Sequence, residues 1–231
     1  MRVELKPRLR MVGDLVPAGV RLADVGTDHG YLPAALVLAG KIPWAVASDL
    51  RRGPLDRARA TVRACGLTGK IAFRLCDGLA GIRPDEVDAA VIAGMGGETI
   101  SAILSAAPWT RERDIPLILQ PMSSLPELRG WLQANGFVIR EERLAREGNT
   151  LYTAMLVRAG EMPPLTPAEL WAGKNNRDPL RGEWLDRWLD RTGRALEGMA
   201  RAQEVLPRRR ELEEVRGGLA EMKKEWEQWQ A

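Results

Sequence analysis

The sequence predicts an α/β fold in which a mostly parallel β-sheet is covered by helices and followed by a helical hairpin. Short β-type runs alternate with helix-type runs between residues 21 and 160. Such alternation is typical of strand–helix–strand crossovers and therefore of a parallel sheet. A proline-rich break follows at residues 161–167, and two long heptad patterns fill the rest of the chain. Heptad patterns indicate helices that pack along a common seam.

The predicted sheet has seven strands, one for each β-type run. These runs are residues 21–26, 44–50, 71–77, 87–95, 116–121, 137–144 and 150–158. Helices are expected at residues 31–40, 53–66, 98–107 and 124–136, with a short lead-in helix at 7–17. Pro54 near the start of one helix and Gly66 after its end have the usual polarity of helix boundaries. The last two strands are joined without a helix, so one strand should run antiparallel to the others.

The C-terminal part is expected to form a second domain. Thr166, Pro167 and Glu169 match a capping box with proline at the first helical position. One seam then joins Leu185, Leu189, Thr192, Leu196 and Met199, and another joins Leu212, Val215, Leu219, Met222, Trp226 and Trp229. Pro207, in the link between the two seams, favours a reversal. We therefore expect an α/β domain at residues 1–160 and an antiparallel, coiled-coil-like helical domain at 161–231.

Composition narrows the functions to consider. The chain has 34 Lys and Arg against 31 Asp and Glu, a net charge of +3, which permits a polyanionic partner without requiring one. No apolar run reaches the roughly 20 residues of a membrane span, and the charged N-terminus lacks the apolar region of a signal peptide. Cys65 and Cys76 lack metal-ligand spacing, so we expect small core residues, no metal and a reduced, cytoplasmic setting. A monomer without a membrane partner is expected.

Acidic residues and glycines gather at the predicted carboxyl ends of the strands, where parallel sheets of this kind bind ligands. These ends read D-V-G-T-D-H-G, S-D-L, C-D-G-L, A-G-M-G-G and Q-P-M. Gly26 permits a tight turn and close ligand approach. Asp49 follows Gly26 by 23 residues, which matches the acid that accepts hydrogen bonds from a ribose diol in dinucleotide folds. Asp77 is placed to accept from an adenine amino group, so the sequence predicts an adenosine-binding rim.

The turn after the first strand disfavours NAD as the ligand. A dinucleotide needs G-x-G-x-x-G so that a helix N-terminus meets the pyrophosphate. Here the turn reads G-T-D-H-G, with Asp28 where the second glycine belongs. A carboxylate repels pyrophosphate and attracts a cation. S-adenosylmethionine carries a sulfonium, an ammonium and an adenosine but no phosphate, so it suits this turn better.

Six blocks of the sequence, taken in order, resemble the bacterial tRNA methyltransferases that modify N1 of adenosine 22. The blocks are D-V-G-T-D-H-G-Y-L-P, A-S-D-L-R-R-G-P, C-D-G-L, I-A-G-M-G-G, L-I-L-Q-P and L-R-G-W-L, within residues 5–160. The resemblance implies a Rossmann-like class I methyltransferase fold, S-adenosylmethionine as methyl donor and a tRNA substrate. By position it implies a cofactor site of Asp24, Gly26, Thr27, Asp28, His29, Leu32, Ser48, Asp49, Asp77, Gly78 and Gly94, to which the strand-end motifs add Leu50 and Leu79.

The expected reaction, methyl transfer to adenine N1, requires little proton transfer by the protein. Neutral adenine N1 has an in-plane lone pair, so the site must mainly orient the reactants, exclude water and receive an unstacked base. The methylated product is cationic, so Asp28 or Asp77 could stabilise its charge, while Gly94 and Met95 shape the base pocket. The fourth strand lacks the Asn/Asp-Pro-Pro-Tyr/Phe motif of methylases that act on exocyclic amines, which favours a ring nitrogen. His29 is open to two interpretations, a ligand contact or a ring packed on the turn.

Several alternatives stay open at this level. Arg51, Arg52, Arg57, Arg59 and Arg63 are either a solvated helix face or phosphate contacts. The tryptophans at 184, 188, 226 and 229 are expected in the core more than as stacking platforms, and Arg208–Arg210 at a solvated hairpin tip. A rival function is a methyltransferase acting on a small molecule or a protein. Another is a cofactor-binding RNA chaperone without turnover.

Overall fold

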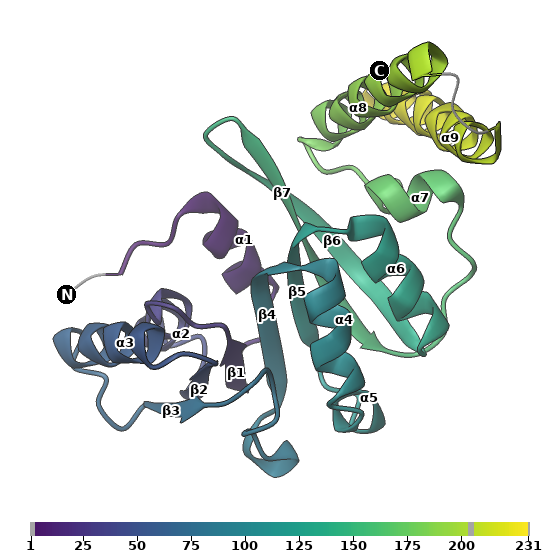
Figure 1. Cartoon of the computed structure of the whole chain (residues 1–231). Coiled ribbons are helices and arrows are strands. Elements are labelled where there is room, and N and C mark those ends of the chain that lie inside the picture. Colours follow the sequence, from purple (N-terminus) through teal and green to yellow (C-terminus); the bar gives the residue numbers. More distant parts are fainter. Residues whose placement is uncertain (1–2, 203–205, 231) are drawn as a thin grey trace.

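A computed structural model, which describes residues 3–202 and 206–230, contains the predicted seven-stranded sheet (Figure 1). The strands are β1 Arg21–Val25, β2 Trp44–Asp49, β3 Ile71–Leu75, β4 Ala89–Gly96, β5 Leu117–Ser123, β6 Phe137–Glu147 and β7 Thr150–Ala159. Their order in the sheet is β3-β2-β1-β4-β5-β7-β6. β7 pairs antiparallel with both β5 and β6, and the pairs from β3 to β5 are parallel. The prediction of a mostly parallel sheet with one antiparallel strand is confirmed.

Helices cover both faces of the sheet because each buries an apolar stripe against it. One face carries α1 Pro7–Leu15, α2 Tyr31–Leu38 and α3 Arg52–Ala64, whose apolar side chains form one cluster with β1, β2 and β4. The other face carries α4 Gly97–Ser105, α5 Trp109–Glu112 and α6 Leu125–Ala134. The side chains of α4 and α6 join a second cluster. The 3-10 helix at Pro84–Glu86 and α5 lie outside the predicted elements, since segments of three or four residues show no periodicity.

The parallel register brings the ends of the first three strands together. Asp24 in β1 lies opposite Ala47 in β2, and Val25 lies opposite Ser48. Asp49 in β2 lies opposite Leu75 in β3. The acidic strand ends therefore meet at one edge of the sheet, as expected for parallel strands.

The C-terminal segment forms three helices, α7 Pro167–Ala172, α8 Arg181–Ala202 and α9 Leu206–Gln230. The predicted capping box of Thr166 and Glu169 is present. α8 and α9 run antiparallel, since Gly182 near the start of α8 lies against Trp226 near the end of α9, and Asp186 pairs with Lys223. The predicted link V-L-P-R-R-R includes Val205, which lies outside the described residues.

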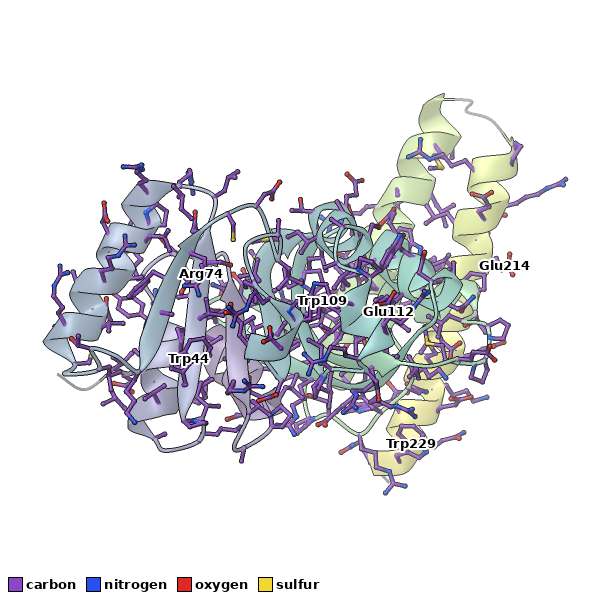
Figure 2. The ribbon with its side chains drawn as sticks, turned by 90° about the horizontal axis from the view of Figure 1, so that it is seen from below. Trp44, Arg74, Trp109, Glu112, Glu214 and Trp229 are labelled. Atoms are coloured by element: carbon purple, nitrogen blue, oxygen red, sulfur yellow. The ribbon has the colours of Figure 1, made fainter. Side chains whose placement is uncertain are left out.

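The helical hairpin shares an apolar cluster with the sheet and α4 and α6. Trp184, Leu185, Trp188, Leu219 and other residues of α8 and α9 belong to the same cluster as residues of those elements. Figure 1 shows α7 beside α6, with the α8–α9 hairpin above them. In Figure 2, Trp229 on α9 and Trp44 on β2 lie toward opposite sides of the molecule.

Two expectations about buried side chains are wrong. Trp229 is 42% exposed, because α8 begins at Arg181 and already faces Trp226 at Gly182, which leaves no turn of α8 to cover the next seam position. Cys65 and Cys76 are half-buried free thiols, since they lie just after α3 and β3 and not inside the core.

The described part of the chain has neither a membrane-crossing helix nor a metal-binding cluster. None of its helices combines the length and the apolar character of a membrane-crossing segment. In residues 3–202 and 206–230, no group of three or more His, Cys, Asp and Glu side chains has an arrangement that could hold a metal ion.

Candidate active site

A glycine turn after β1 forms the centre of the site. Gly26 has φ +75°, and the N–H groups of Gly26 and Thr27 donate to the Ser48 carbonyl at 2.9 and 3.0 Å. These bonds fasten the turn to the end of β2. A Cβ at Gly26 would collide with Cε of Met95, which comes from β4. Glycine is therefore required here both by conformation and by close approach.

Asp24 supplies a buried carboxylate beneath this turn. Its side chain is 5% exposed, and the Thr27 hydroxyl donates to Oδ2 at 2.5 Å. Burial raises the pKa of Asp24 to about 6, the Thr27 hydrogen bond opposes this rise, and the nearby Asp49 carboxylate adds to it. Asp24 is thus a negative charge at neutral pH in a site that makes that charge costly, a combination that is common at functional sites.

Asp28 and His29 lie on the exposed side of the turn. Asp28 has φ +46°, an uncommon conformation for a residue other than glycine. Its carboxylate pairs with Arg57 of α3 at 2.6 Å and lies 3.6 Å from Nε2 of His29. The His29 ring stacks on Tyr31, with ring centroids 5.1 Å apart. This geometry gives His29 a packing partner and leaves 40% of its side chain exposed.

Asp49 and Asp77 follow at the ends of β2 and β3. The N–H of Arg51 donates to Oδ1 of Asp49 at 2.9 Å, which fixes the carboxylate at the strand end. A cavity of about 460 Å³ runs from the loop Asp77–Ala80 to α4. Gly78, at φ +51°, lies so close to α4 that a Cβ would approach Ile103 to 2.9 Å. The cavity borders Asp77, the carboxylate that the sequence predicts to accept from an adenine amino group.

The remaining predicted cofactor residues differ in burial and in whether they line the cavity. Ser48 is fully buried, and its hydroxyl donates to the Gly78 carbonyl at 3.3 Å, which joins the ends of β2 and β3. Leu79 is buried and lines the cavity. Leu50 is 67% exposed. Leu32 is buried in the apolar cluster that includes residues of α1, so the structure gives it a core position.

The end of β4 holds Gly94 and Met95 beside two residues that sequence reasoning missed. Gln120, fully buried in β5, accepts from the Gly94 N–H at 3.2 Å and from Nη1 of Arg8 at 2.6 Å. Gly94 has φ +77°, and Arg8 would lie 3.5 Å from a Cβ built there. Arg8 and Gln120 are 112 residues apart, so no local pattern could join them. The block L-I-L-Q-P contains Gln120, but the sequence analysis assigned this residue no role, and no feature of the lead-in helix singled out Arg8.

These features define a class of protein. The strand order, the single antiparallel strand β7 and the glycine turn with acids at successive strand ends make a Rossmann-like class I methyltransferase fold. A family model described as a methyltransferase domain matches residues 5–155.

Comparison with known proteins narrows the class. The Bacillus subtilis tRNA (adenine(22)-N(1))-methyltransferase is 36% identical over 159 residues, which cover 69% of this chain and 67% of that protein. A structure of a candidate tRNA (m1A22) methyltransferase from Streptococcus pneumoniae, in complex with S-adenosyl-L-methionine, has a TM-score of 0.80 and 33% identity and covers 95% of this chain and 100% of its own. M. capricolum TrmK in complex with S-adenosyl-homocysteine has a TM-score of 0.75 and 26% identity, over 96% and 98% of the two chains. The chain described here belongs to the tRNA (adenine(22)-N(1))-methyltransferase family.

Proposed function

We propose that this protein transfers a methyl group from S-adenosylmethionine to N1 of adenosine 22 in tRNA. The observation that carries the proposal is the set of acidic strand ends around a turn that suits a cationic nucleoside and disfavours pyrophosphate. The curated relative from B. subtilis, a tRNA (adenine(22)-N(1))-methyltransferase, supplies the substrate and the position of the methylated atom.

The described residues fit the cofactor. We assign Asp49 to the ribose hydroxyls, because its strand-end carboxylate has acceptor capacity beyond the single bond from Arg51. The cavity beside Asp77 takes the adenine. Asp24 and Asp28 face the cationic end, since one lies beneath the turn and the other on its exposed side. When bound, S-adenosylmethionine supplies an electrophilic methyl group on a sulfonium.

The end of β4 is assigned to the acceptor base. Gly94 leaves space that a side chain would fill, and the Gly94–Gln120–Arg8 hydrogen bonds hold the backbone there in place. Met95 packs on the turn at Gly26 and lies between the sites proposed for the cofactor and the acceptor base. Because adenine N1 needs no deprotonation, these residues act by orienting the base and excluding water. Asp28 or Asp77 would stabilise the cationic product.

The wider organisation is proposed on the same basis. Residues 1–160 would form the catalytic domain and residues 161–231 a helical domain that acts together with it, in keeping with their shared apolar cluster. A monomeric state and a cytoplasmic location stay predictions.

Methyl-labelled S-adenosylmethionine and unmodified tRNA transcripts test the proposal. We expect label in a transcript with adenosine at position 22 and none in the same transcript with guanosine there. Label in both transcripts would move the methylated site elsewhere. Label in protein or small molecules alone, or tRNA binding without any transfer, would contradict the proposal and favour a rival function.

A further inference from the structure

Arg8 of α1 lies at the end of β4, in the place proposed for the acceptor base. Its Nη1 is 3.5 Å from the position that a Cβ on Gly94 would occupy, and it donates to Oε1 of Gln120 at 2.6 Å. The guanidinium also lies over the ring of Tyr152 in β7, 5.7 Å from the ring centroid. Because Gly94 is exposed and Arg8 is only half-buried, a substrate can reach this arginine.

Buried contacts fix the direction of the Arg8 guanidinium. Gln120 is fully buried, and its orientation is set because Nε2 donates to the Pro121 carbonyl at 2.9 Å. Its Oε1 accepts from both Arg8 and the Gly94 N–H. The Arg8 side chain is therefore ordered before a ligand arrives, and binding costs less conformational entropy than it would for a free surface arginine.

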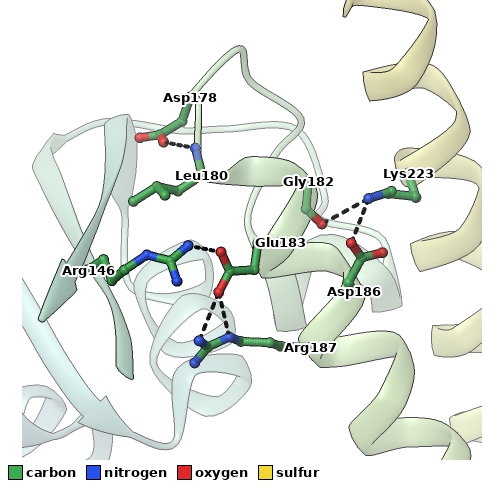
Figure 3. A network of polar contacts seen from close by, with 8 residues as sticks. All are labelled: Arg146, Asp178, Leu180, Gly182, Glu183, Asp186, Arg187 and Lys223. Atoms are coloured by element: carbon green, nitrogen blue, oxygen red, sulfur yellow. Dashed lines mark hydrogen bonds and ion pairs between the residues drawn. The ribbon is translucent and has the colours of Figure 1, made fainter. Parts of the chain in front are cut away.

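The charge of Arg8 is free, unlike the charges of arginines on β6 and α8. Arg146 of β6 and Arg187 of α8 both pair with Glu183 (Figure 3). The Glu147 carboxylate accepts from the main-chain N–H of Arg8 at 3.3 Å. In the part of the chain that the structure describes, however, no carboxylate lies within ion-pair distance of the Arg8 guanidinium. Arg8 is thus a fixed cation that is available to an anion.

The anion that suits Arg8 is a phosphate and not the acceptor base. The sulfonium of the cofactor and the N1-methylated adenine are both cationic, so a guanidinium beside them is unfavourable unless an anion accompanies it. In tRNA, the phosphates next to the methylated nucleotide supply that anion. Gln120 accepts from Nη1 alone, which leaves other N–H donors of the guanidinium free. These donors form a planar fork that matches two phosphate oxygens.

We propose that Arg8 binds a phosphate next to the methylated adenosine of the tRNA. This inference rests on the proposed function. The contact holds the sugar-phosphate backbone of the acceptor nucleotide while its base lies at Gly94. Because Gln120 bonds both Arg8 and the Gly94 N–H, the phosphate site and the base site keep a fixed geometry. Such positioning lowers the barrier to methyl transfer by orienting the acceptor.

Arg8 and Arg10 provide a matched pair of variants. Arg10 lies on the same helix, its side chain is 61% exposed, and its carboxylate partner is Glu4 at 3.8 Å. We expect Arg8→Gln to weaken binding of an unmodified tRNA transcript at least about tenfold, because a charge-assisted contact is lost. It should also lower the slope of log affinity against log salt by about 1. Arg10→Gln removes the same charge and should change affinity less than about twofold.

A third variant and a cofactor measurement separate phosphate binding from a structural role. Arg8→Lys should bind tRNA with an affinity between those of wild type and Arg8→Gln, because lysine keeps the charge but loses the fork. Calorimetry should show that S-adenosylmethionine binds all three variants as well as it binds wild type, since the lost contact is with tRNA. A structural role alone predicts the opposite pattern, in which cofactor affinity or kcat falls and the salt slope stays unchanged.

Neutral backbone linkages identify the phosphate. Transcripts with a single methylphosphonate near position 22 lack one backbone charge each. At one linkage, this change should weaken binding by wild type and by Arg10→Gln, yet cause no further loss in Arg8→Gln.

Three results would overturn the inference while wild type still methylates tRNA and the proposed function stands. These are equal tRNA affinity of the two glutamine variants, the absence of such a linkage, and the pattern of a structural role. If S-adenosylmethionine binds but wild type never methylates tRNA, the proposed function itself fails.

Discussion

At the scale of single residues, the charge of Asp24 has a cost that follows from its burial. Its pKa is raised to about 6, so the folded protein holds a proton that the unfolded chain releases near pH 4. The stability that this proton provides is present at pH 4 and is lost as pH rises through 6. The protein keeps a buried carboxylate at neutral pH, which is expected where a cationic ligand is bound.

Asp24→Asn should show this cost as a pH-dependent gain in stability. Relative to wild type, the variant should gain about 2 kcal/mol in free energy of unfolding between pH 4.5 and pH 7.5, because it lacks the ionising group. Urea unfolding at both pH values measures it. Asp88→Asn is the control, since the bonds from Arg21 hold the pKa of Asp88 at about 2 and its charge is constant over this range. An equal effect of Asp24→Asn at both pH values would refute the assignment.

Asp28 and Arg57 form a pair whose two halves should act in opposite directions. The Asp28 charge is partly neutralised by Arg57 at 2.6 Å. Asp28→Asn should weaken S-adenosylmethionine binding several-fold and slow turnover, whereas Arg57→Gln should preserve or strengthen binding because the carboxylate is then unpaired. Calorimetry and initial rates measure both. Unchanged affinity and turnover in Asp28→Asn would show that this carboxylate does not face the cationic ligand.

At the scale of elements, strand ends were easier to predict from sequence than contacts between elements. Asp24, Asp49 and Asp77 could be placed together because the carboxyl ends of parallel strands share one edge. Arg8 could not be predicted, since its contact with Gln120 depends on where α1 packs. Likewise α5 is one turn long and shows no periodicity, and the exposure of Trp229 depends on where α8 begins.

The glycine pair in α9 illustrates the same limit. From sequence, Gly217 and Gly218 only weaken the helix, each by about 1 kcal/mol relative to alanine. In the structure, a Cβ at Gly218 would approach Cβ of Ala168 in α7 to 2.7 Å, while a Cβ at Gly217 meets no described atom within 4 Å. Gly218 therefore permits α7 to pack on α9.

These neighbouring glycines should respond oppositely to the same substitution. Gly217→Ala should stabilise the protein by about 0.5–1 kcal/mol through helix propensity. Gly218→Ala should destabilise it by about 1–3 kcal/mol because α7 must shift. Thermal or urea unfolding gives both values. Equal stabilisation by the two substitutions would show that α7 does not approach α9 as described.

At the scale of the whole molecule, a buried ion pair attaches the helical segment to the sheet. Arg129 of α6 is 1% exposed, pairs with Glu142 of β6 at 2.8 Å and donates to the carbonyls of Leu170 and Trp171 in α7. No pattern in the sequence predicts that this arginine lies inside the protein. Its burial depends on three elements that meet only in the folded chain.

Replacing one partner of this ion pair should destabilise the protein far more than replacing both. Arg129→Leu leaves the Glu142 charge buried and should cost about 3–5 kcal/mol in unfolding free energy. The double variant Arg129→Leu, Glu142→Leu should recover much of that loss, although the α7 carbonyls stay unpaired. A double-mutant cycle by urea unfolding measures the coupling. Additive losses would mean that the two side chains do not interact.

The most direct measurement of the central claim is calorimetry of the wild-type protein with three nucleoside ligands. The acidic strand ends should bind S-adenosylmethionine and S-adenosylhomocysteine at one site per chain, and Asp49→Ala should weaken both. NAD should give no binding heat, because Asp28 stands where its pyrophosphate would lie. Absence of S-adenosylmethionine binding, or binding of NAD at the same site, would contradict the account.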